Sequence, residues 1–251
     1  MGPVGKIKQW LPVSLRRPLK QVALRLISVV RPELTPVTPG TLDLDELVLL
    51  LGKDDPVIVE IGCNNGSHTV QFLERFPRAR IYGFEPDPRA AADFKKRLGH
   101  DPRVRLYEVA IAAQDGEADF FMSDTHPEAG IPRSWYDSGS IRRPKKHLEV
   151  FPWVTFPRTI RVPTCRLDTW YQQNGIETID FIWADVQGAE VDLIQGGLQA
   201  LANTRYFYTE YANTELYEGQ INLAQLLRLL PDFQLVYRFR GDVLLKNKRL
   251  Q

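Results

Sequence analysis

The sequence predicts an α/β fold in which a mostly parallel sheet carries helices on both faces and ends in an antiparallel hairpin. From Leu42 onward, strand-like and helix-like segments alternate, which is typical of a parallel sheet with crossover helices. The segment 56–62, PVIVEIG, is rich in β-branched residues, as buried strands are, and leads into a glycine-bounded turn. Near the end of the chain, Gly241-Asp242 separates two strand-like runs and predicts the hairpin.

The individual elements follow from apolar spacing and from the residues that end them. Val70, Leu73 and Phe76 recur at helical spacing, and Gly52 and Gly99 mark two helix ends. Up to residue 111 the predicted order is helix 45–52, strand 56–62, helix 68–76, strand 79–86, helix 89–99 and strand 104–111. It continues with strands 118–123 and 159–165, strand 179–186, helix 189–197, strand 205–212, helix 222–230 and hairpin 233–247.

The composition is that of a globular protein. The 251 residues are 43% hydrophobic and 25% charged, which suits one substantial domain. A net charge of +1 gives no reason to expect a nucleic-acid partner. Cys63 and Cys165 cannot build a disulfide framework, and histidine is scarce, so neither bridges nor a structural zinc site are expected. Without a spanning-length apolar run or a signal peptide, the expectation is a reduced, cytoplasmic protein.

Residues 1–40 differ from the rest of the chain. Basic residues precede the first acidic residue, Glu33, and are interleaved with apolar ones such as Trp10 and Leu15. This pattern predicts a basic amphipathic extension, followed by a proline-rich linker at 31–40. One hypothesis is peripheral contact with an anionic membrane or an acidic partner; the other is a helical extension that packs on the main domain, residues 41–251.

The turn after the strand 56–62 is the candidate ligand site, because open parallel sheets bind ligands beyond the carboxyl ends of their strands. Gly62 and Gly66 bound it, but the dinucleotide pattern G-x-G-x-x-G is absent. Glu60 lies inside the apolar strand, and Glu85 ends the next one, where a carboxylate can accept bonds from ribose hydroxyls. Together these residues suggest a ligand that has a ribose and an amine but no pyrophosphate, and S-adenosylmethionine is such a ligand. The alternative is a plain turn, with Glu60 capping amides and Glu85 in solvent.

The segments VEIGCNNG and GFEPDP resemble the first two motifs of class I S-adenosylmethionine-dependent methyltransferases. Three further segments, EVAIAAQDGEADFF, DSGSI and CRLDTWYQQNGIETIDFIWADVQGAEVDLIQGG, are similar to the FkbM-type family of that class. The resemblance spans residues 56–245. It implies a Rossmann-like methyltransferase fold and methylation of a hydroxyl on a small molecule, typically a sugar or a natural-product intermediate.

The resemblance also implies a set of cofactor-binding residues. They come from the turn, the end of the second strand, the segment near 110 and the end of the fourth strand: Glu60, Gly62, Cys63, Asn64, Asn65, Gly66, Ser67, Glu85, Pro86, Asp87, Val109, Ala110 and Asp185. The chain departs from the family pattern at Trp183 and Gln187, where the family usually has Lys and Glu. A catalytic role carried over from that Glu is therefore in doubt.

Methylation of an alcohol requires a group that removes the hydroxyl proton. The candidates are Asp185 and Glu210, at strand ends, and His126 and His147, in the segment 123–158. Asp185 and Glu210, with Glu190, can alternatively hold Mg²⁺; Glu190 can instead simply favour the start of its helix.

The segment 123–158 is predicted to be a lid or a substrate-binding insertion, and the alternative is a solvated loop. Trp135 and Trp153 are candidates for stacking on a sugar, and an anionic substrate is the candidate ligand of Arg133, Arg142, Arg143, Lys145 and Lys146.

Two other functions remain open at the level of sequence. A similar sheet is compatible with an NAD-dependent oxidoreductase, although the missing glycine pattern and the terminal hairpin argue against it. A non-catalytic binding protein on a methyltransferase fold is compatible with the changes at Trp183 and Gln187.

Overall fold

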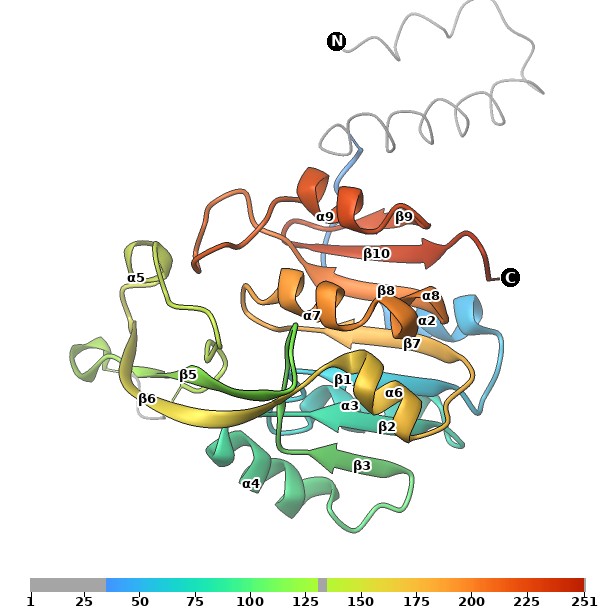
Figure 1. Cartoon of the computed structure of the whole chain (residues 1–251), viewed down its shortest axis with the longest axis horizontal. Coiled ribbons are helices and arrows are strands. Elements are labelled where there is room, and N and C mark those ends of the chain that lie inside the picture. The colour runs from blue at the N-terminus through green and yellow to red at the C-terminus, as the bar shows by residue number, and fades with distance from the viewer. Residues whose placement is uncertain (1–34, 131–134, 251) are drawn as a thin grey trace, which may run out of the picture.

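A seven-stranded sheet forms the centre of the molecule in the computed structural model, which describes residues 35–130 and 135–250 (Figure 1). The strand order is β3-β2-β1-β7-β8-β10-β9. The strands are β1 (Val57–Ile61), β2 (Arg80–Phe84), β3 (Val104–Tyr107), β7 (Ile179–Ala184), β8 (Thr204–Glu210), β9 (Phe233–Arg238) and β10 (Asp242–Asn247). The strands from β3 to β8 run parallel, whereas β10 is antiparallel to both β8 and β9. The predicted mostly parallel sheet with a C-terminal hairpin is confirmed.

Helices cover both faces of this sheet. Every residue of β1 is buried, which explains its unbroken apolar run apart from Glu60. Val59 faces one core cluster and Ile58 faces the other. On the Ile58 side lie α2 (Leu44–Leu51), α3 (Ser67–Arg75) and α4 (Pro88–Leu98); on the Val59 side lie α6 (Leu167–Gln173), α7 (Glu190–Gly196), α8 (Leu198–Ala202) and α9 (Leu223–Leu229).

Local hydrogen bonds close the helix ends, including the predicted end at Gly52. Gly52 adopts a left-handed conformation (φ 65°) after α2, and its N–H donates to the carbonyl of Val48. Asn222 and Gln225 form a reciprocal cap at the start of α9. These local bonds satisfy backbone groups that a helix leaves unpaired at its ends.

A second, three-stranded sheet projects from the domain beside the carboxyl ends of the large one (Figure 1). Its strands, in the order β4-β6-β5, are β4 (Ala110–Ile111), β5 (Gly116–Thr125) and β6 (Val154–Cys165). The single strand predicted at 104–111 is therefore wrong: β3 ends at Tyr107, and the chain then leaves the large sheet so that β4 pairs with β6. Alternation of apolar residues does not reveal which partner strand is used.

The hairpin of β5 and β6 is longer than predicted, because the two strands pair antiparallel from Gly116–Thr164 to Thr125–Val154. The ends of both strands thus fall inside 123–158, which also contains η3 (Pro127–Ala129) and α5 (His147–Val150). Whether this segment moves as a lid stays a prediction.

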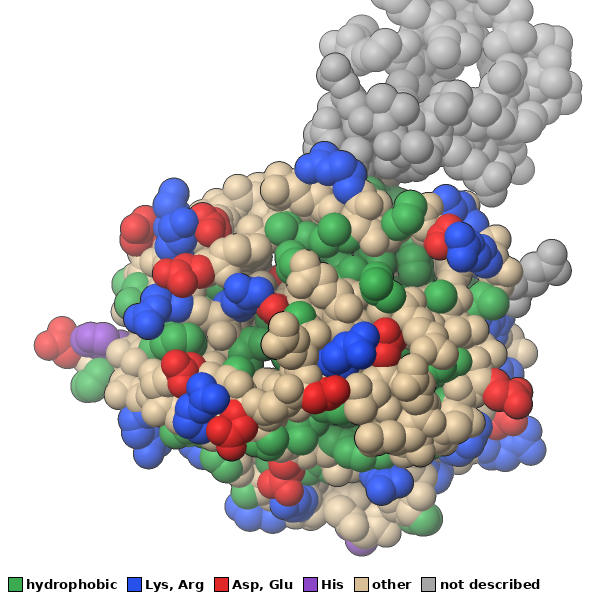
Figure 2. Space-filling view, viewed as in Figure 1, with side chains coloured by type: hydrophobic (Ala, Val, Ile, Leu, Met, Phe, Trp, Pro, Cys, Tyr) green, Lys and Arg blue, Asp and Glu red, His purple; other side chains and the backbone are tan. Residues whose placement is uncertain are grey.

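Residues 1–34 lie outside the described residues, and so does the predicted amphipathic extension. The following linker runs beside β9, where the N–H of Thr38 donates to the carbonyl of Arg238. Lys and Arg side chains alternate with Asp and Glu over the face in Figure 2, in keeping with the small net charge. Within the described ranges, no helix has the length and apolar character to cross a membrane.

Candidate active site

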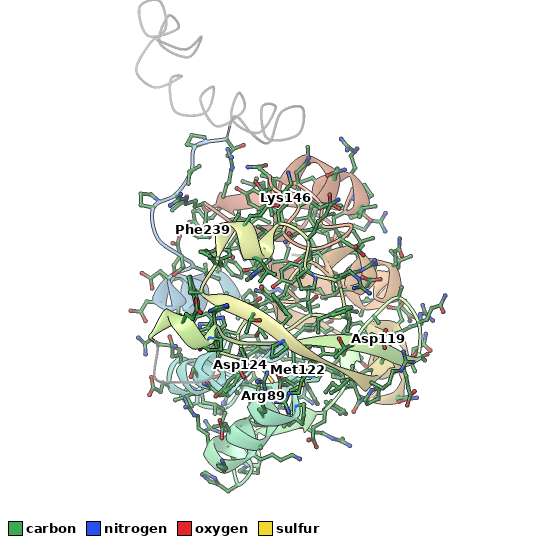
Figure 3. All side chains as sticks on the ribbon, turned by 90° about the vertical axis from the view of Figure 1, so that its left-hand side faces the viewer. Arg89, Asp119, Met122, Asp124, Lys146 and Phe239 are labelled. Carbon is green, nitrogen blue, oxygen red and sulfur yellow. The ribbon has the colours of Figure 1, made fainter. Side chains whose placement is uncertain are left out.

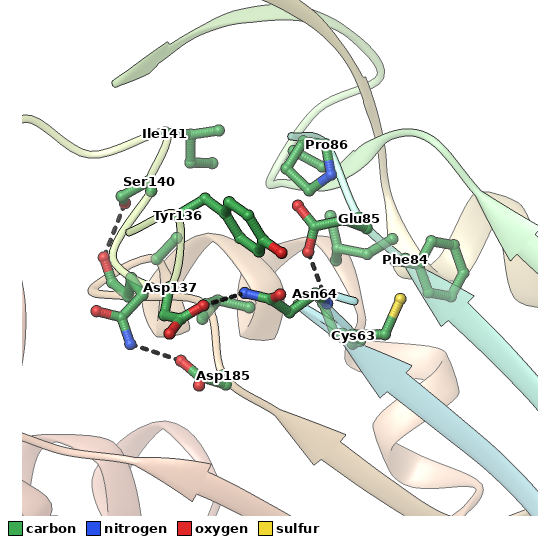
Figure 4. A pocket seen from close by; sticks show the side chains of 18 of the residues that line it. Cys63, Asn64, Phe84, Glu85, Pro86, Tyr136, Asp137, Ser140, Ile141 and Asp185 are labelled. Atoms are coloured by element: carbon green, nitrogen blue, oxygen red, sulfur yellow. Dashed lines mark hydrogen bonds between the residues drawn. The ribbon is translucent and has the colours of Figure 1, made fainter. Parts of the chain in front are cut away.

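A cavity of about 410 Å³ opens at the carboxyl ends of β1, β2 and β7 (Figure 4). This is the edge of a parallel sheet at which ligands bind, and the volume lies in the range of small-molecule sites. Three parts of the chain form its walls: the turn after β1, the ends of β2 and β7, and the segment near Ala110. A fourth part, residues 135–141 between β5 and β6, lies over the cavity and is called the roof segment below.

The turn after β1 requires its glycines for packing. Gly62 has φ 79°, and a Cβ there would lie 1.9 Å from the carbonyl oxygen of Asp185. Gly66 has φ 78°, and a Cβ there would lie 2.8 Å from Leu98 and 2.9 Å from Phe94. The glycines therefore allow the turn to approach the end of β7 and the helix α4, and a role in binding pyrophosphate is not needed to explain them.

Glu85 is held at the end of β2 by backbone donors. The N–H of Asn64 donates to Oε2 (2.8 Å), and the N–H of Asp87 donates to Oε1 (2.7 Å). The residue is only 6% exposed, so the alternative of a solvated Glu85 is wrong. Burial raises its pKa to about 8. Glu85 lines the cavity, and each of its carboxyl oxygens takes only one backbone bond, which leaves capacity for a further bond to a ribose hydroxyl.

Among the other predicted cofactor residues, Cys63, Asn64, Asn65, Ser67, Pro86, Val109, Ala110 and Asp185 line the cavity together with Gly62 and Glu85. Glu60, Gly66 and Asp87 do not belong to the lining. Asp87 is 1% exposed and caps α4 by accepting from the N–H of Arg89 (2.9 Å). These three residues support the walls and face away from the ligand space.

Glu60 lies beneath the turn. The hydroxyl of Thr69 in α3 donates to its Oε2 (2.5 Å), and the residue is 1% exposed. Burial raises the pKa of Glu60 to about 8, so the carboxyl is mostly protonated at neutral pH. A neutral buried carboxyl needs no cationic partner, which removes the reason for expecting the ligand amine beside it.

Apolar side chains line the part of the cavity beside β4. Phe84, Val109, Ile111, Phe120 and Ile141 face it. Phe84 also stacks on Tyr107 at 5.0 Å between ring centroids. This region suits a flat aromatic base such as adenine.

Asp185 lies at the other end, directly after β7. The Nε2 of Gln187 donates to Oδ1 of Asp185 (2.6 Å) and also approaches Oε2 of Glu210 (3.3 Å). The Oε1 of the same amide accepts from the hydroxyl of Tyr217 (2.9 Å). Burial raises the pKa of Asp185 to about 6. Burial and the nearby Asp185 raise the pKa of Glu210. Structure thus brings two of the predicted bases together, although Glu210 lies behind Gln187 and outside the cavity lining.

The amide of Gln187 lies between the two carboxylates that were the candidate metal ligands. Within the described parts of the chain, no group of three or more His, Cys, Asp or Glu side chains is arranged to hold a metal ion. Glu190 instead begins α7, where its Oε1 accepts from the N–H of Gly188 (3.1 Å). The structure therefore offers no support for the magnesium hypothesis.

Neither candidate histidine lines the cavity. His126 caps η3, because its Nδ1 accepts from the N–H of Glu128 (3.2 Å). His147 is 3% exposed and packs against Phe151, Phe156 and Tyr217. Burial lowers the pKa of His147 to about 4. Both positions fit structural roles.

The described basic residues of 123–158 do not line the cavity either. Arg142 makes two hydrogen bonds of 2.6 Å to Asp192, and Lys145 forms an ion pair with Glu215. Arg143 lies over the ring of Phe121. Arg133 is outside the described residues. No basic side chain therefore lies in the described cavity walls to support the hypothesis of an anionic substrate.

The predicted stacking pair, Trp135 and Trp153, packs edge to face with ring centroids 4.6 Å apart. The indole N–H of Trp135 donates to Oγ of Ser138 (3.0 Å). Neither ring lines the cavity, so the pair stabilises the base of the roof segment.

Sequence reasoning missed several lining residues, namely His68 of α3 and Tyr136, Asp137, Ser140 and Ile141 of the roof segment. Asn64 Nδ2 donates to Oδ1 of Asp137 (2.9 Å), and Oγ of Ser140 donates to the carbonyl of Gln187 (2.7 Å). The motif DSGSI was the available signal, since a conspicuous polar motif inside an irregular segment indicates a site.

Trp183, one of the two departures from the family pattern, stacks on Tyr208 at 4.3 Å between ring centroids. His68 packs against Trp183 as well, with 4.7 Å between ring centroids. An aromatic stack thus stands where the family usually has a lysine, and it supports His68 at the cavity wall.

Three features together define a class I S-adenosylmethionine-dependent methyltransferase. They are the strand order, the antiparallel last strand, and a cavity in which the carboxyl group of Glu85 lies beside apolar side chains. The chain belongs to the FkbM methyltransferase family, because the family model for the methyltransferase FkbM domain matches residues 60–239.

One curated relative agrees with this assignment. The chain is 50% identical over 209 residues to the 2-O-methyltransferase NoeI of Sinorhizobium fredii, an alignment that covers 82% of this chain and 85% of NoeI. It is 26% identical over 176 residues to the AMB antimetabolite synthetase AmbE of Pseudomonas aeruginosa, covering 62% of this chain and 8% of AmbE. The chain is thus an S-adenosylmethionine-dependent O-methyltransferase, and neither the oxidoreductase nor the non-catalytic alternative finds support.

Solved structures with a similar chain course include a putative O-methyltransferase from Klebsiella pneumoniae, with a TM-score of 0.43, 13% identity, and coverage of 96% of this chain and 93% of that one. Another is Aeropyrum pernix fibrillarin in complex with natively bound S-adenosyl-L-methionine, with a TM-score of 0.42, 13% identity, and coverage of 90% and 74%. Assignment of the family rests on the family model and the curated relative.

Proposed function

We propose that this enzyme methylates the 2-hydroxyl of a sugar or of a closely related polyhydroxylated small molecule. The similarity to a 2-O-methyltransferase supports the position, and the substrate class is the one that the resemblance to the FkbM family implies. The observation that carries the proposal is Asp185, a carboxylate in the cavity wall at the end of β7. No Lys or Arg lies among the described lining residues, which suits an uncharged acceptor.

The walls fit S-adenosylmethionine. Glu85 is placed for the ribose, and the apolar side chains beside β4 are placed for adenine. Gly66 gives α3 no side-chain cap, and the N–H of Ser67 donates to Oδ1 of Asn65 (3.1 Å), so the N–H groups of His68 and Thr69 are the proposed donors to the carboxylate of the methionine end. When bound, this cofactor supplies an electrophilic methyl group on a sulfonium.

Asp185 is proposed as the general base. Gln187 holds its Oδ1, which leaves Oδ2 to accept the proton of the acceptor hydroxyl. A base is most effective when its pKa lies near the working pH, and the pKa of Asp185 is raised by burial to about 6. Glu210 lies behind Gln187 and accepts from the same amide, and burial together with the nearby Asp185 raises its pKa.

The proposal assigns no role to magnesium, because the amide of Gln187 lies between Asp185 and Glu210. It places the reaction in the cytoplasm on the basis of two free cysteines, one of them buried. Peripheral membrane contact through residues 1–34 stays a hypothesis about a segment outside the described residues.

The decisive test is methyl transfer from labelled S-adenosylmethionine to matched sugar glycosides. We expect labelling of a glycoside with a free 2-hydroxyl, and none of its 2-deoxy or 2-O-methyl counterparts. Equal labelling of the 2-deoxy compound would place the reaction on another hydroxyl. Asp185→Asn is assayed on the same acceptors. A wrong acceptor is one that the wild type does not label, whereas loss of the base should abolish turnover on every acceptor that the wild type does label.

A further inference from the structure

The hydroxyl of Tyr217 lies between two acceptors. It is 2.8 Å from the carbonyl oxygen of Ser138, in the roof segment, and 2.9 Å from Oε1 of Gln187, after β7. Burial raises the pKa of Tyr217, so the hydroxyl keeps its proton. A hydroxyl has one proton to donate, and therefore only one of the two acceptors receives it at a time.

Packing keeps Tyr217 near both acceptors. The residue is 1% exposed, and its ring packs against those of His147 (5.3 Å between centroids) and Phe156 (6.4 Å). A Cβ at Gly188 would lie 2.6 Å from Cβ of Tyr217, so this glycine allows the tyrosine to approach the turn after β7. The acceptor that receives no proton then faces a lone pair of the tyrosine oxygen, which is an unfavourable contact.

Rotation of the side-chain amide of Gln187 removes this conflict. The oxygen and the NH2 group of an amide occupy similar volumes, so half a turn exchanges acceptor and donor while neighbouring atoms stay in place. In one orientation Nε2 donates to Oδ1 of Asp185 (2.6 Å; Figure 4), and Oε1 accepts from Tyr217. In the other orientation Nε2 donates to the oxygen of Tyr217, whose proton goes to the carbonyl of Ser138.

The proton of Asp185 determines which orientation forms. The facing atoms of Gln187 and Asp185 are 2.6 Å apart, so one of them must donate to the other. An ionised Asp185 has no proton and requires Nε2 at this place, whereas a protonated Asp185 can donate to Oε1. Glu210 is 3.3 Å from the same atom of Gln187 and is the weaker partner because of this longer distance.

The titratable groups around Asp185 are all carboxyls. They approach it from the neighbouring strands, from α7 and from the roof segment: Glu60, Glu85, Asp137, Glu190, Glu210 and Asp242. Burial, with smaller contributions from Asp242 and Asp137, raises the pKa of Asp185 to about 6. Its protonation therefore changes in a pH range in which the enzyme can be studied.

The hairpin that carries the roof segment is anchored on α4. Arg89 donates to the carbonyl of Ser123 (2.8 Å) and lies 3.6 Å from Oδ2 of Asp124 in β5. Figure 3 shows Arg89 close to Asp124 and Met122, at the base of the hairpin. This anchor does not involve the end of β7, so the hold on the roof segment there can change by itself.

Two kinds of bond connect the roof segment with the region beyond β7. Oγ of Ser140 donates to the backbone carbonyl of Gln187 (2.7 Å), and this bond does not depend on the orientation of the side-chain amide. The bond from Tyr217 to Ser138 does depend on it, because it forms only when Tyr217 does not donate to Gln187.

We propose that Tyr217 is a positioning residue that couples the proton of Asp185 to the hold on the roof segment. When Asp185 is ionised, Tyr217 donates to Gln187, and the carbonyl of Ser138 loses this donor. When Asp185 carries a proton, Tyr217 donates to Ser138, and the roof segment gains a bond. The enzyme that is ready to take up a proton thus holds its roof segment less tightly, which favours entry of the acceptor. This use in turnover rests on the proposed role of Asp185 as the base, whereas the coupling itself does not.

The test is amide hydrogen exchange of residues 135–141 in the full chain, without acceptor and corrected for the intrinsic effect of pH on exchange. In the wild type, protection should rise about 5-fold as the pH is lowered from about 7.5 to about 5, as gain of one hydrogen bond predicts. Tyr217→Phe has no hydroxyl proton to exchange between the acceptors, so the rise should largely be lost. Asp185→Asn does not titrate, so the rise should be lost there as well.

Tyr171→Phe is the matched control. Tyr171 is also buried and also donates to a backbone carbonyl, that of Glu177 (2.8 Å), but it lies outside the cavity lining. This variant should keep the rise in protection. Other carboxyls that titrate in this range are present in all these proteins, so the difference between wild type and Tyr217→Phe isolates the bond to the roof segment.

An unchanged rise in Tyr217→Phe would overturn the proposal. So would a wild type in which protection of the roof segment does not change with pH, and that result does not depend on whether any variant folds.

Turnover gives an independent measurement. The hydroxyl of Tyr217 takes part in two bonds when Asp185 is protonated and in one when it is ionised, so its removal favours the ionised form. In Tyr217→Phe the pKa of Asp185 should fall, and the acid limb of the plot of kcat against pH should move to lower pH by about half a unit to one unit. An acid limb that stays in place would mean that Tyr217 acts through packing alone, which contradicts the proposal. If Asp185→Asn keeps its turnover while the exchange results are as expected, the proposed base is wrong and the coupling stands.

Discussion

The two sides of the cavity are built by different means. Backbone bonds position the strand wall: the N–H groups of Gly62 and Cys63 donate to the carbonyl of Phe84, and that of Asp185 donates to Ile61. Side chains position the roof segment, through Asp137 and the other contacts that cross the cavity. The geometry of the wall is therefore a consequence of sheet register, whereas the geometry of the roof depends on individual side chains. Substitutions can alter the roof with little effect on the fold.

The largest effect is expected at the wall, from Asp185→Asn. Removal of the base should lower kcat by roughly 10²–10⁴-fold, the usual contribution of general base catalysis, with little change in affinity for S-adenosylmethionine. Steady-state turnover together with calorimetric binding measures both quantities. A comparable loss from Glu210→Gln but not from Asp185→Asn would place the base behind Gln187.

Glu85→Ala should mainly affect binding. It removes the partner of two ribose bonds, each worth about 1 kcal/mol for a carboxyl whose pKa is raised to about 8, so affinity for the cofactor should fall roughly 30-fold. Titration with S-adenosylhomocysteine measures this loss without an acceptor. If the affinity is unchanged, the ribose does not bind at the end of β2. Glu108→Ala, at an exposed position just after β3, is the control.

Ser140→Ala tests the roof. The variant loses the bond from Oγ to the carbonyl of Gln187, worth about 1 kcal/mol, and the bond that Oγ accepts from the N–H of Arg142, so kcat/KM should fall about 5-fold while the melting temperature falls by only a few degrees. Thermal melting and initial rates give the two values. A large loss of stability with no loss of activity would mean that the roof is part of the core rather than an independent element.

Gln187→Glu tests the connection between the two sides. An added carboxylate beside Asp185 replaces a donor that lowers its pKa, so the pKa should rise above about 6. Because the base works deprotonated, the acid limb of the plot of kcat against pH should move to higher pH, by about one unit. A shift to lower pH, or none, would show that Gln187 does not contact the working base.

The smallest effect on turnover is expected from Glu60→Gln, beneath the wall. The pKa of Glu60 is raised to about 8 in the folded protein, from an ordinary value of 4.5, so the folded state holds a proton that the unfolded state releases. Stability from this group is fully present below about pH 4.5 and is lost as pH rises through about 8.

The variant is neutral at every pH, so its free energy of unfolding should fall less between about pH 5 and about pH 9 than that of the wild type. Denaturant unfolding at several pH values measures this slope. Some slope remains in the variant, because burial also raises the pKa of Glu85 to about 8 and that of Glu190 to about 7. An identical slope in both proteins would mean that Glu60 is ionised in the folded state.

The wall was largely predictable from sequence, because its residues are consecutive and its form follows from a strand, a turn and a helix. Cys63, Asn64 and Glu85 were predicted and line the cavity. Glu60 was predicted as a ligand residue, yet it faces α3, since side chains alternate across a strand and Glu60 shares the face of Ile58. A carboxyl in a buried strand does not by itself reveal its partner.

The roof was not predictable in the same way. Asp137 was quoted as part of a motif but was not assigned to the site, and His126 and His147 were assigned to it instead. The segment between β5 and β6 has no periodic pattern, so the direction of its side chains depends on contacts with distant residues. Asn64, at 73 positions from Asp137 in the chain, is one of these.

The amino-acid sequence by itself determined the parallel sheet, the terminal hairpin, the glycine turn and the class of cofactor, because these follow from local spacing of apolar residues, glycines and carboxylates. Only the tertiary structure decided which carboxylates face the cavity, that Gln187 lies between Asp185 and Glu210, and that Asp137 lines the cavity. The physical reason is distance along the chain: local patterns specify elements, whereas burial and long-range hydrogen bonds set the direction and the pKa of each side chain.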